Sequence, residues 1–138
     1  MFIDASAIVA ILNREPDSDQ IVHRIGDHKG QRFVSALVRF ETVAAVARSR
    51  SGAQRPTPEQ FEAAEKIVAA FCDSIDAKDI SITGAVGTRA MLAARTYGKM
   101  VGHKADLNFG DCFAYACAST YSARLVYKGD DFAKTDLA

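Results

Sequence analysis

Short apolar runs alternate along this chain with segments whose apolar residues recur at helical spacing. A short apolar run bounded by polar or turn residues is typical of a buried strand. Such runs predict strands at residues 1–4, 32–35, 79–82 and 124–127. Helical periodicity, together with proline and glycine breaks, predicts helices at residues 6–12, 17–27, 36–50, 58–71, 85–97 and 110–122. Strands that alternate with helices predict right-handed βαβ crossovers and a parallel sheet covered on both faces.

Four acidic residues stand at the ends of these apolar segments or within them. Asp4 closes the first strand, and Asp131 follows the fourth strand in a turn. Glu41 lies inside the apolar run 38–43, and Asp111 lies at the start of the last predicted helix. In a parallel α/β sheet, the ligand crevice lies outside the carboxyl ends of the strands. We therefore expect these four carboxylates, distant in sequence, to share one crevice.

Carboxylates clustered in this way favour a metal site. An unpaired charge is expensive to bury, so buried carboxylates usually have partners. Several carboxylates in one cleft can hold a hard divalent cation through their oxygens, with Mg²⁺ as the natural candidate and Mn²⁺ as the alternative. Simpler interpretations remain open. Asp4 and Asp111 could be N-caps of the helices that follow them, Glu41 a paired surface charge, and Asp131 part of a turn.

The composition fits one globular domain, residues 1–138. An apolar fraction of 49% and a charged fraction of 25% are ordinary for a soluble domain of this length. Seventeen basic and seventeen acidic residues cancel, so no global positive field indicates a nucleic-acid partner. That balance argues more strongly against a protein that binds duplex DNA than against an enzyme that contacts only a few phosphates.

The three cysteines and the chain's hydropathy bear on its compartment. Cys72, Cys112 and Cys117 lack CxxC spacing and lie in apolar stretches, which predicts buried, reduced thiols and neither a disulfide framework nor a zinc site. The sequence shows no signal-peptide pattern and no run of about 18 apolar residues that could span a membrane. A cytoplasmic protein is therefore expected.

Three stretches and one glutamate, taken together in order, resemble a known family. Residues 1–7 place a serine two positions after Asp4, Glu41 follows within an apolar helix, residues 107–116 read Leu-Asn-Phe-Gly-Asp-Cys-Phe-Ala-Tyr-Ala, and residues 128–132 read Lys-Gly-Asp-Asp-Phe. Over essentially the whole chain this pattern resembles the PIN-domain proteins, and specifically the VapC toxin ribonucleases of bacterial type II toxin–antitoxin systems. The resemblance implies a three-layer α/β/α fold with a short central parallel sheet.

By this resemblance Asp4, Glu41, Asp111 and Asp131 are the catalytic acids, although Asp130 could take the place of its neighbour. Because Mg²⁺ usually keeps several waters and few protein carboxylates, Asp4 and Asp111 are the first choices for residues that bind the ion directly. The other two acids are expected to bind it directly or through water, one of them acting as general base. Two auxiliary residues are also expected. Ser6 is expected to hydrogen-bond a ligand water or a phosphate oxygen, and Asn108 to orient a carboxylate or contact the substrate.

The resemblance also implies partners. It implies an Mg²⁺-dependent endoribonuclease toxin that cuts single-stranded or loop RNA, and a cognate VapB-type antitoxin that occludes the acidic site with a basic side chain. It further implies a homodimer, and a toxin–antitoxin complex that binds operator DNA through the antitoxin.

Two other classes of function compete with the toxin. A non-catalytic RNA-binding module could inhibit translation by occupancy, but RNA binding needs no cluster of negative charge. A phosphotransfer or phosphatase domain of the receiver or haloacid dehalogenase type also carries aspartates at strand ends. The dehalogenase pattern expects a second aspartate two residues after the first, where this chain has Ser6.

Overall fold

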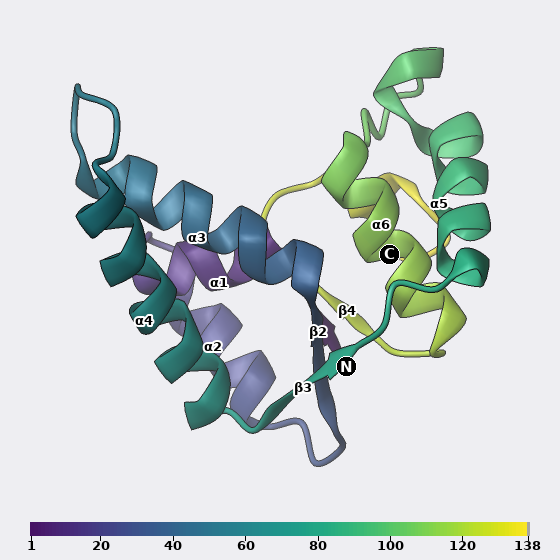
Figure 1. The fold of residues 1–138 in the computed structure, drawn as a ribbon. Coiled ribbons are helices and arrows are strands. Elements are labelled where there is room, and N and C mark those ends of the chain that lie inside the picture. The colour runs from purple at the N-terminus through teal and green to yellow at the C-terminus, as the bar shows by residue number, and fades with distance from the viewer. Residues whose placement is uncertain (138) are drawn as a thin grey trace.

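The computed structural model describes residues 1–137 and divides them into short strands joined by longer helices (Figure 1). The elements in chain order are β1 (Phe2–Ile3), α1 (Ala5–Leu12), α2 (Ser18–Gly26), β2 (Arg32–Ser35), α3 (Ala36–Arg50), α4 (Pro58–Ser74), β3 (Ala77–Ile80), α5 (Gly84–Tyr97), the 3₁₀ turn η1 (Lys99–Val101), α6 (Phe109–Thr120), β4 (Leu125–Val126) and the 3₁₀ turn η2 (Phe132–Lys134).

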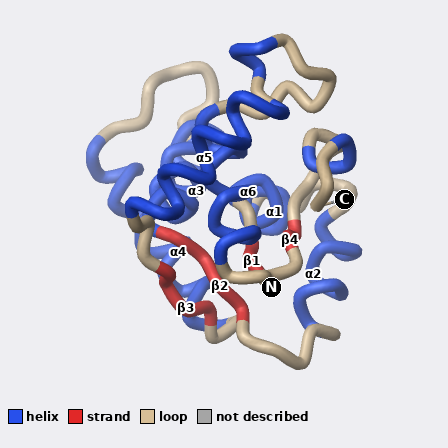
Figure 2. Tube along the Cα trace, turned by 90° about the vertical axis from the view of Figure 1, so that its right-hand side faces the viewer, coloured by secondary structure: helices blue, strands red, loops and turns tan. Residues whose placement is uncertain are grey.

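All four strands pair in parallel, as the sequence pattern predicted, and their order in the sheet is β3-β2-β1-β4 (Figure 2). The third strand begins two residues earlier than expected. Ala77 pairs with Arg32 and Ile80 with Ser35, so β3 extends along the whole of β2. The pairing with β2 determines where β3 begins. Lys78 and Asp79 are polar residues of an edge strand, so the hydropathy pattern did not indicate this start.

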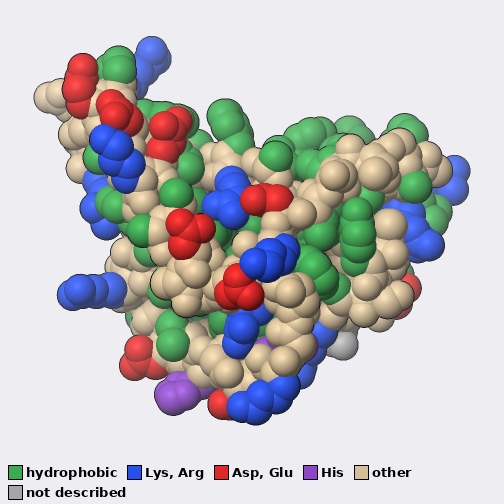
Figure 3. All heavy atoms as spheres, turned by 60° about the horizontal axis from the view of Figure 1, so that its bottom comes forward, with side chains coloured by type: hydrophobic (Ala, Val, Ile, Leu, Met, Phe, Trp, Pro, Cys, Tyr) green, Lys and Arg blue, Asp and Glu red, His purple; other side chains and the backbone are tan. Residues whose placement is uncertain are grey.

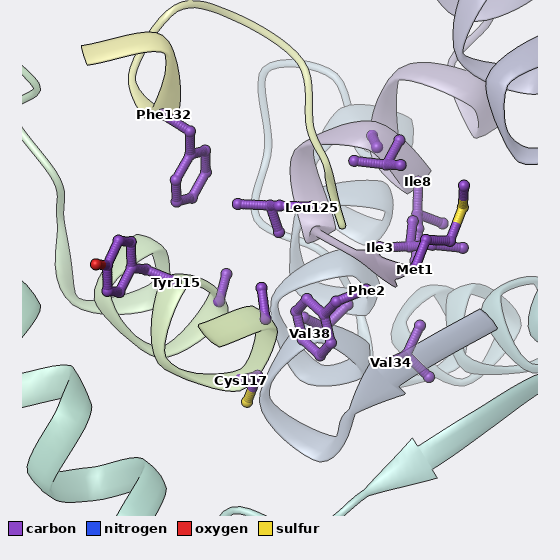
Figure 4. Packing of buried hydrophobic residues seen from close by; sticks show 14 of the residues in the cluster. Met1, Phe2, Ile3, Ile8, Val34, Val38, Tyr115, Cys117, Leu125 and Phe132 are labelled. Carbon is purple, nitrogen blue, oxygen red and sulfur yellow. The ribbon is translucent and has the colours of Figure 1, made fainter. Parts of the chain in front are cut away.

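The sheet lies between two layers of helices (Figure 1). Helices α1 to α4 occupy one side, where α1 packs on α2 and α3, and α3 packs on α4. Helices α5 and α6 pack on each other on the other side, and α6 contacts β1 and β4. Side chains of β1, β4, α3 and α6 meet in the core between the layers (Figure 4), where Phe2, Ile3 and Val126 are fully buried. Burial of each such side chain contributes about 1.5–3 kcal/mol as an upper estimate.

Helix starts are fixed by side-chain caps, and these caps place the acidic residues. Ser35 ends β2 and caps α3 through the Val38 amide, so α3 begins at the carboxyl end of the strand without a loop. Glu41 therefore lies within about two turns of that edge of the sheet. Thr57 and Gln60 form a capping box at the start of α4, and Pro58 occupies its first helical position.

The remaining expectations about the scaffold concern the thiols and the membrane. Cys72, Cys112 and Cys117 are all free and buried. Within residues 1–137, no helix combines the length and the apolar character that a bilayer crossing requires.

Candidate active site

Asp4 is held at the carboxyl end of β1 by Ser6. The Asp4 carboxylate accepts the Ser6 amide at 3.0 Å and the Ser6 hydroxyl at 2.5 Å, both on Oδ2. Asp4 is thus the N-cap of α1, as the simpler interpretation proposed, and it is also 96% buried because its exposed fraction is 4%. The cap and the functional interpretation are therefore not exclusive.

Ser6 makes two hydrogen bonds within the protein. Its hydroxyl oxygen accepts the Lys128 amide at 3.0 Å while its proton goes to Asp4. Both bonds are within the protein, so the hydroxyl links the end of β4 to the end of β1. Ser6 positions Asp4.

Asp111 is oriented by Asn108 at the start of α6. The Asn108 side chain accepts the Asp111 amide at 3.1 Å, and Asp111 Oδ2 accepts the Asn108 amide at 2.8 Å. This reciprocal capping box makes Asn108, and not Asp111, the N-cap. The backbone amide of Asn108 thus bonds the Asp111 carboxylate, and the Asn108 side chain caps α6.

Glu41 projects from α3 toward the start of α6. The helices α3 and α6 contact each other, and the Glu41 carboxylate lies against Gly110, the residue before Asp111. Its side chain is half-buried. Glu41 is therefore not the paired surface charge of the simpler interpretation.

Asp131 is exposed and precedes η2, where its side chain makes no capping bond. Its negative charge nevertheless contributes to the raised pKa values of Asp4 and Asp111. The structure therefore brings the four acids within electrostatic reach of one another, with Asp4 deepest and Asp131 at the solvent edge.

The site favours protonated carboxyl groups. Burial, followed by the Asp4 and Asp111 charges, raises the pKa of Glu41 to about 7. Burial also raises the pKa of Asp111 to about 6, despite the opposing hydrogen bond from Asn108. Burial is likewise the largest cause of the raised pKa of Asp4. Like charges and desolvation both disfavour the ionised forms, so a bound cation would relieve them.

The chain supplies no basic side chain to these acids. Within residues 1–137, the ion pairs join other residues, and none includes Asp4, Glu41, Asp111 or Asp131. Lys128 directs its side chain to Glu15 while its backbone amide bonds Ser6. Sequence reasoning missed this ion pair because its partners are separated by 113 positions. Neutralisation of the site must therefore come from outside these residues.

The donors fit a small hard cation. Oxygen-only ligands suit Mg²⁺ or Mn²⁺, and Mg²⁺ is typically bound by one or two carboxylates while it keeps several waters. Among residues 1–137, no group of three or more His, Cys, Asp and Glu side chains already stands close enough to enclose an ion. A site that uses two direct carboxylates and water-mediated contacts requires no such group.

Stability should depend on pH through Glu41. Its pKa in the folded protein, about 7, lies above the ordinary value of 4.5, so protonation favours the folded state. This contribution is fully present below about pH 4.5 and is lost as the pH rises through about 7.

In EDTA, we expect Glu41→Gln to raise the melting temperature clearly at pH 8 and little at pH 5. Glu65→Gln, at an exposed position on α4, is the control and should change neither melt. An equal effect of Glu41→Gln at both pH values would contradict the assigned environment.

Comparison with known proteins identifies the family of this chain. The family model of the PIN domain matches residues 1–137. A VapC ribonuclease of Rhizobium meliloti (strain 1021) is 44% identical over 139 residues, covering 99% of this chain and 98% of the relative. Ribonuclease VapC30 of Mycobacterium tuberculosis is 38% identical over 144 residues, covering 100% of this chain and 96% of the relative.

Solved structures share the fold at lower identity. Mycobacterium tuberculosis VapC20, a sarcin–ricin loop cleaving toxin, superposes with a TM-score of 0.68 at 17% identity and covers 96% of this chain and 92% of its own. A chain of a toxin–antitoxin complex from Klebsiella pneumoniae superposes with a TM-score of 0.65 at 14% identity. The match covers 99% of the present chain and 92% of the Klebsiella chain. The expected three-layer α/β/α fold is confirmed. With the full-length match and the 44% identical relative, the chain belongs to the PIN-domain family and, within it, to the VapC ribonucleases.

Proposed function

We propose that this VapC ribonuclease is an Mg²⁺-dependent endoribonuclease whose four acids hold the ion, and that a cognate antitoxin blocks the same acids. One observation carries the proposal: Asp4, Glu41 and Asp111 are brought together with raised pKa values, and no cationic side chain of residues 1–137 forms an ion pair with them. A module that only bound RNA would gain nothing from this arrangement, because buried acids repel phosphates.

Asp4 and Asp111 are the direct ligands in this proposal. Each is oriented by hydrogen bonds to its own helix start, which holds its position before an ion arrives. When bound, Mg²⁺ supplies a water of lowered pKa and offsets negative charge on the phosphate oxygens.

Glu41 and Asp131 complete the mechanism. Glu41 accepts the proton of the attacking water at its carboxylate, since its pKa of about 7 suits a base near neutral pH. Asp131 lies at the exposed side, where it would contact a bound ion through water. The influence of its charge on Asp4 and Asp111 supports choosing Asp131 over Asp130.

Neutralising either direct ligand should abolish cleavage and preserve the fold. We expect Asp4→Asn and Asp111→Asn each to lower the rate about 10³-fold, equivalent to roughly 4 kcal/mol of lost charge stabilisation. Asp130→Asn is the matched control and should keep wild-type activity. The measurement is cleavage of single-stranded RNA with Mg²⁺ or Mn²⁺, with melting curves to verify folding.

Ca²⁺ should substitute poorly, because its larger and looser shell positions water less well. Undiminished cleavage in excess EDTA would exclude the metal mechanism.

Inhibition by the antitoxin follows from the same charge. A guanidinium can bind carboxylate oxygens in a bidentate fork, so an arginine directed at Asp4, Glu41 and Asp111 would occupy the ion's place. Most of the affinity should come from an apolar segment laid on the toxin, since buried ion pairs largely offset their own desolvation.

Replacing that basic residue of the antitoxin with alanine should therefore separate inhibition from binding. We expect the variant to restore much of the nuclease activity while the complex weakens only modestly. Titration of the toxin with each antitoxin, followed by RNA cleavage and by calorimetry, measures both quantities. A variant that binds and still inhibits fully would mean that bulk, and not occupation of the acids, excludes RNA.

The proposed homodimer has a candidate face on α5, η1 and α6. Large apolar side chains are exposed there, and the α5–α6 groove beside them has a volume of about 570 Å³. Hydrophobic side chains gather on the right-hand side of Figure 3, where α5 and α6 lie. Exposed patches of this kind mark interaction sites. The exposed residues of this face are Met91, Leu92, Met100, Val101 and Phe109.

A charge placed on this face should break the dimer. Met100, whose exposed fraction is 87%, can be changed to lysine without disturbing the core. We expect Met100→Lys to sediment as a monomer at micromolar concentration, where the wild type sediments as a dimer. Val22→Lys, on exposed α2, is the control and should remain dimeric. A dimer that survives Met100→Lys would place the interface elsewhere.

Operator binding is proposed for the antitoxin and not for this chain. The seventeen basic and seventeen acidic residues cancel, and charges of both signs are interspersed on the face seen in Figure 3. DNA affinity depends mainly on basic residues that contact phosphates, so the complex is expected to owe its DNA affinity to the antitoxin.

A further inference from the structure

Gly110 is a buried glycine in the first turn of α6. It is the second residue of α6, is buried, and does not have a positive φ. The backbone therefore does not require glycine here. Glycine also stabilises a helix less than alanine does. Its presence points to a constraint outside the helix backbone.

That constraint is the carboxylate of Glu41. A Cβ added to Gly110 would lie 2.6 Å from Glu41 Cδ, 2.7 Å from Oε2 and closer still to Oε1. Separations under 3.0 Å are essentially never seen for a real Cβ, so alanine cannot coexist with the Glu41 carboxylate in this position. The three nearest atoms all belong to that one carboxyl group. Glu41 thus occupies the volume that any other side chain at position 110 would fill.

Other glycines of the chain differ in this respect. A Cβ on Gly84 or Gly87, both in α5, would meet nothing within 4 Å. A Cβ on Gly98 would meet the backbone of Ala94, which is a constraint of the scaffold. Only at Gly110, among the glycines of the described chain, does an acid of the candidate site stand within 4 Å of the added atom.

Glu41 depends on this contact because its neighbours do not hold it otherwise. Asp4 and Asp111 are each fixed by hydrogen bonds, whereas for Glu41 the raised pKa reflects only burial and the two neighbouring charges. A carboxylate surrounded by like charges is repelled from them, so its position must be set by packing. The close approach of α3 to α6 at Gly110 provides that packing.

We propose that Gly110 is a positioning residue of the nuclease: by lacking a side chain, it leaves the space in which the Glu41 carboxylate reaches Asp4 and Asp111. This inference rests on the proposed function for its catalytic consequence, but the steric contact does not. A side chain at position 110 displaces Glu41 and leaves the other acids in place. The obstructing atoms are the end of a flexible side chain, so the fold can adapt.

The steric claim is tested without RNA or metal, by melting curves in EDTA. Gly110→Ala should lower the melting temperature when Glu41 is present, and its effect should be less destabilising in a Glu41→Ala background. In that background the space is free, and Gly110→Ala should leave the melting temperature unchanged or raise it. Gly84→Ala is the matched control, because it also lies in the first turn of a helix, and its effect should be the same in both backgrounds. An effect of Gly110→Ala that is equal in both backgrounds, including unfolding in both, would overturn the proposal.

The catalytic claim is tested by RNA cleavage with Mg²⁺. Gly110→Ala should lower kcat about tenfold or more with little change in KM, whereas Gly84→Ala should change neither. Aspartate at position 41 is one methylene shorter and retreats from position 110. In a Glu41→Asp background, the further loss caused by Gly110→Ala should therefore shrink to about twofold or less. The same fold-loss in both backgrounds, or full activity of Gly110→Ala, would show that Gly110 does not act through Glu41. A wild type that cleaves no RNA would refute the proposed function and leave the melting result standing.

Discussion

The burial of three neighbouring carboxylates, Asp4, Glu41 and Asp111, is the constraint on which the rest of this structure depends. Ionised acids that are partly buried together lose hydration and repel one another, and both effects appear as raised pKa values at Asp4, Glu41 and Asp111. The scaffold must offset this cost. It does so with a core in which β1 and β4, the strands that precede Asp4 and Asp131, are entirely buried. A parallel sheet is suited to this task, because it collects the ends of distant segments at one edge.

The acids are held in two different ways, and the difference fits the chemistry. Hydrogen bonds within the protein orient Asp4 and Asp111, through Ser6 and Asn108. Packing against Gly110 sets Glu41, and Asp131 is exposed. Two fixed ligands and two adjustable ones suit Mg²⁺, which binds few carboxylates directly and holds others through its waters. The Ser6 hydroxyl also links Asp4 to the end of β4.

Much of the fold could be predicted because its signals are local. Apolar runs located the strands, and helical periodicity together with a proline break located the start of α4 at Pro58. Interactions between distant segments could not be predicted. The start of β3 depends on its register with β2, and the role of Ser6 depends on a backbone amide 122 positions away. The sequence drew attention to Asp111 through its motif, but the reason for Gly110 beside it emerges only when α3 is packed against α6.

The most direct test of the central claim is to locate the cation itself. Crystals of the protein grown with Mn²⁺ give an anomalous difference map in which the ion is identified independently of its ligands. The account predicts one dominant peak at about 2.0–2.2 Å from oxygens of both Asp4 and Asp111, with Glu41 and Asp131 at direct or water-bridged distance. A map without a peak between Asp4 and Asp111, at an Mn²⁺ concentration that supports RNA cleavage, would contradict the account.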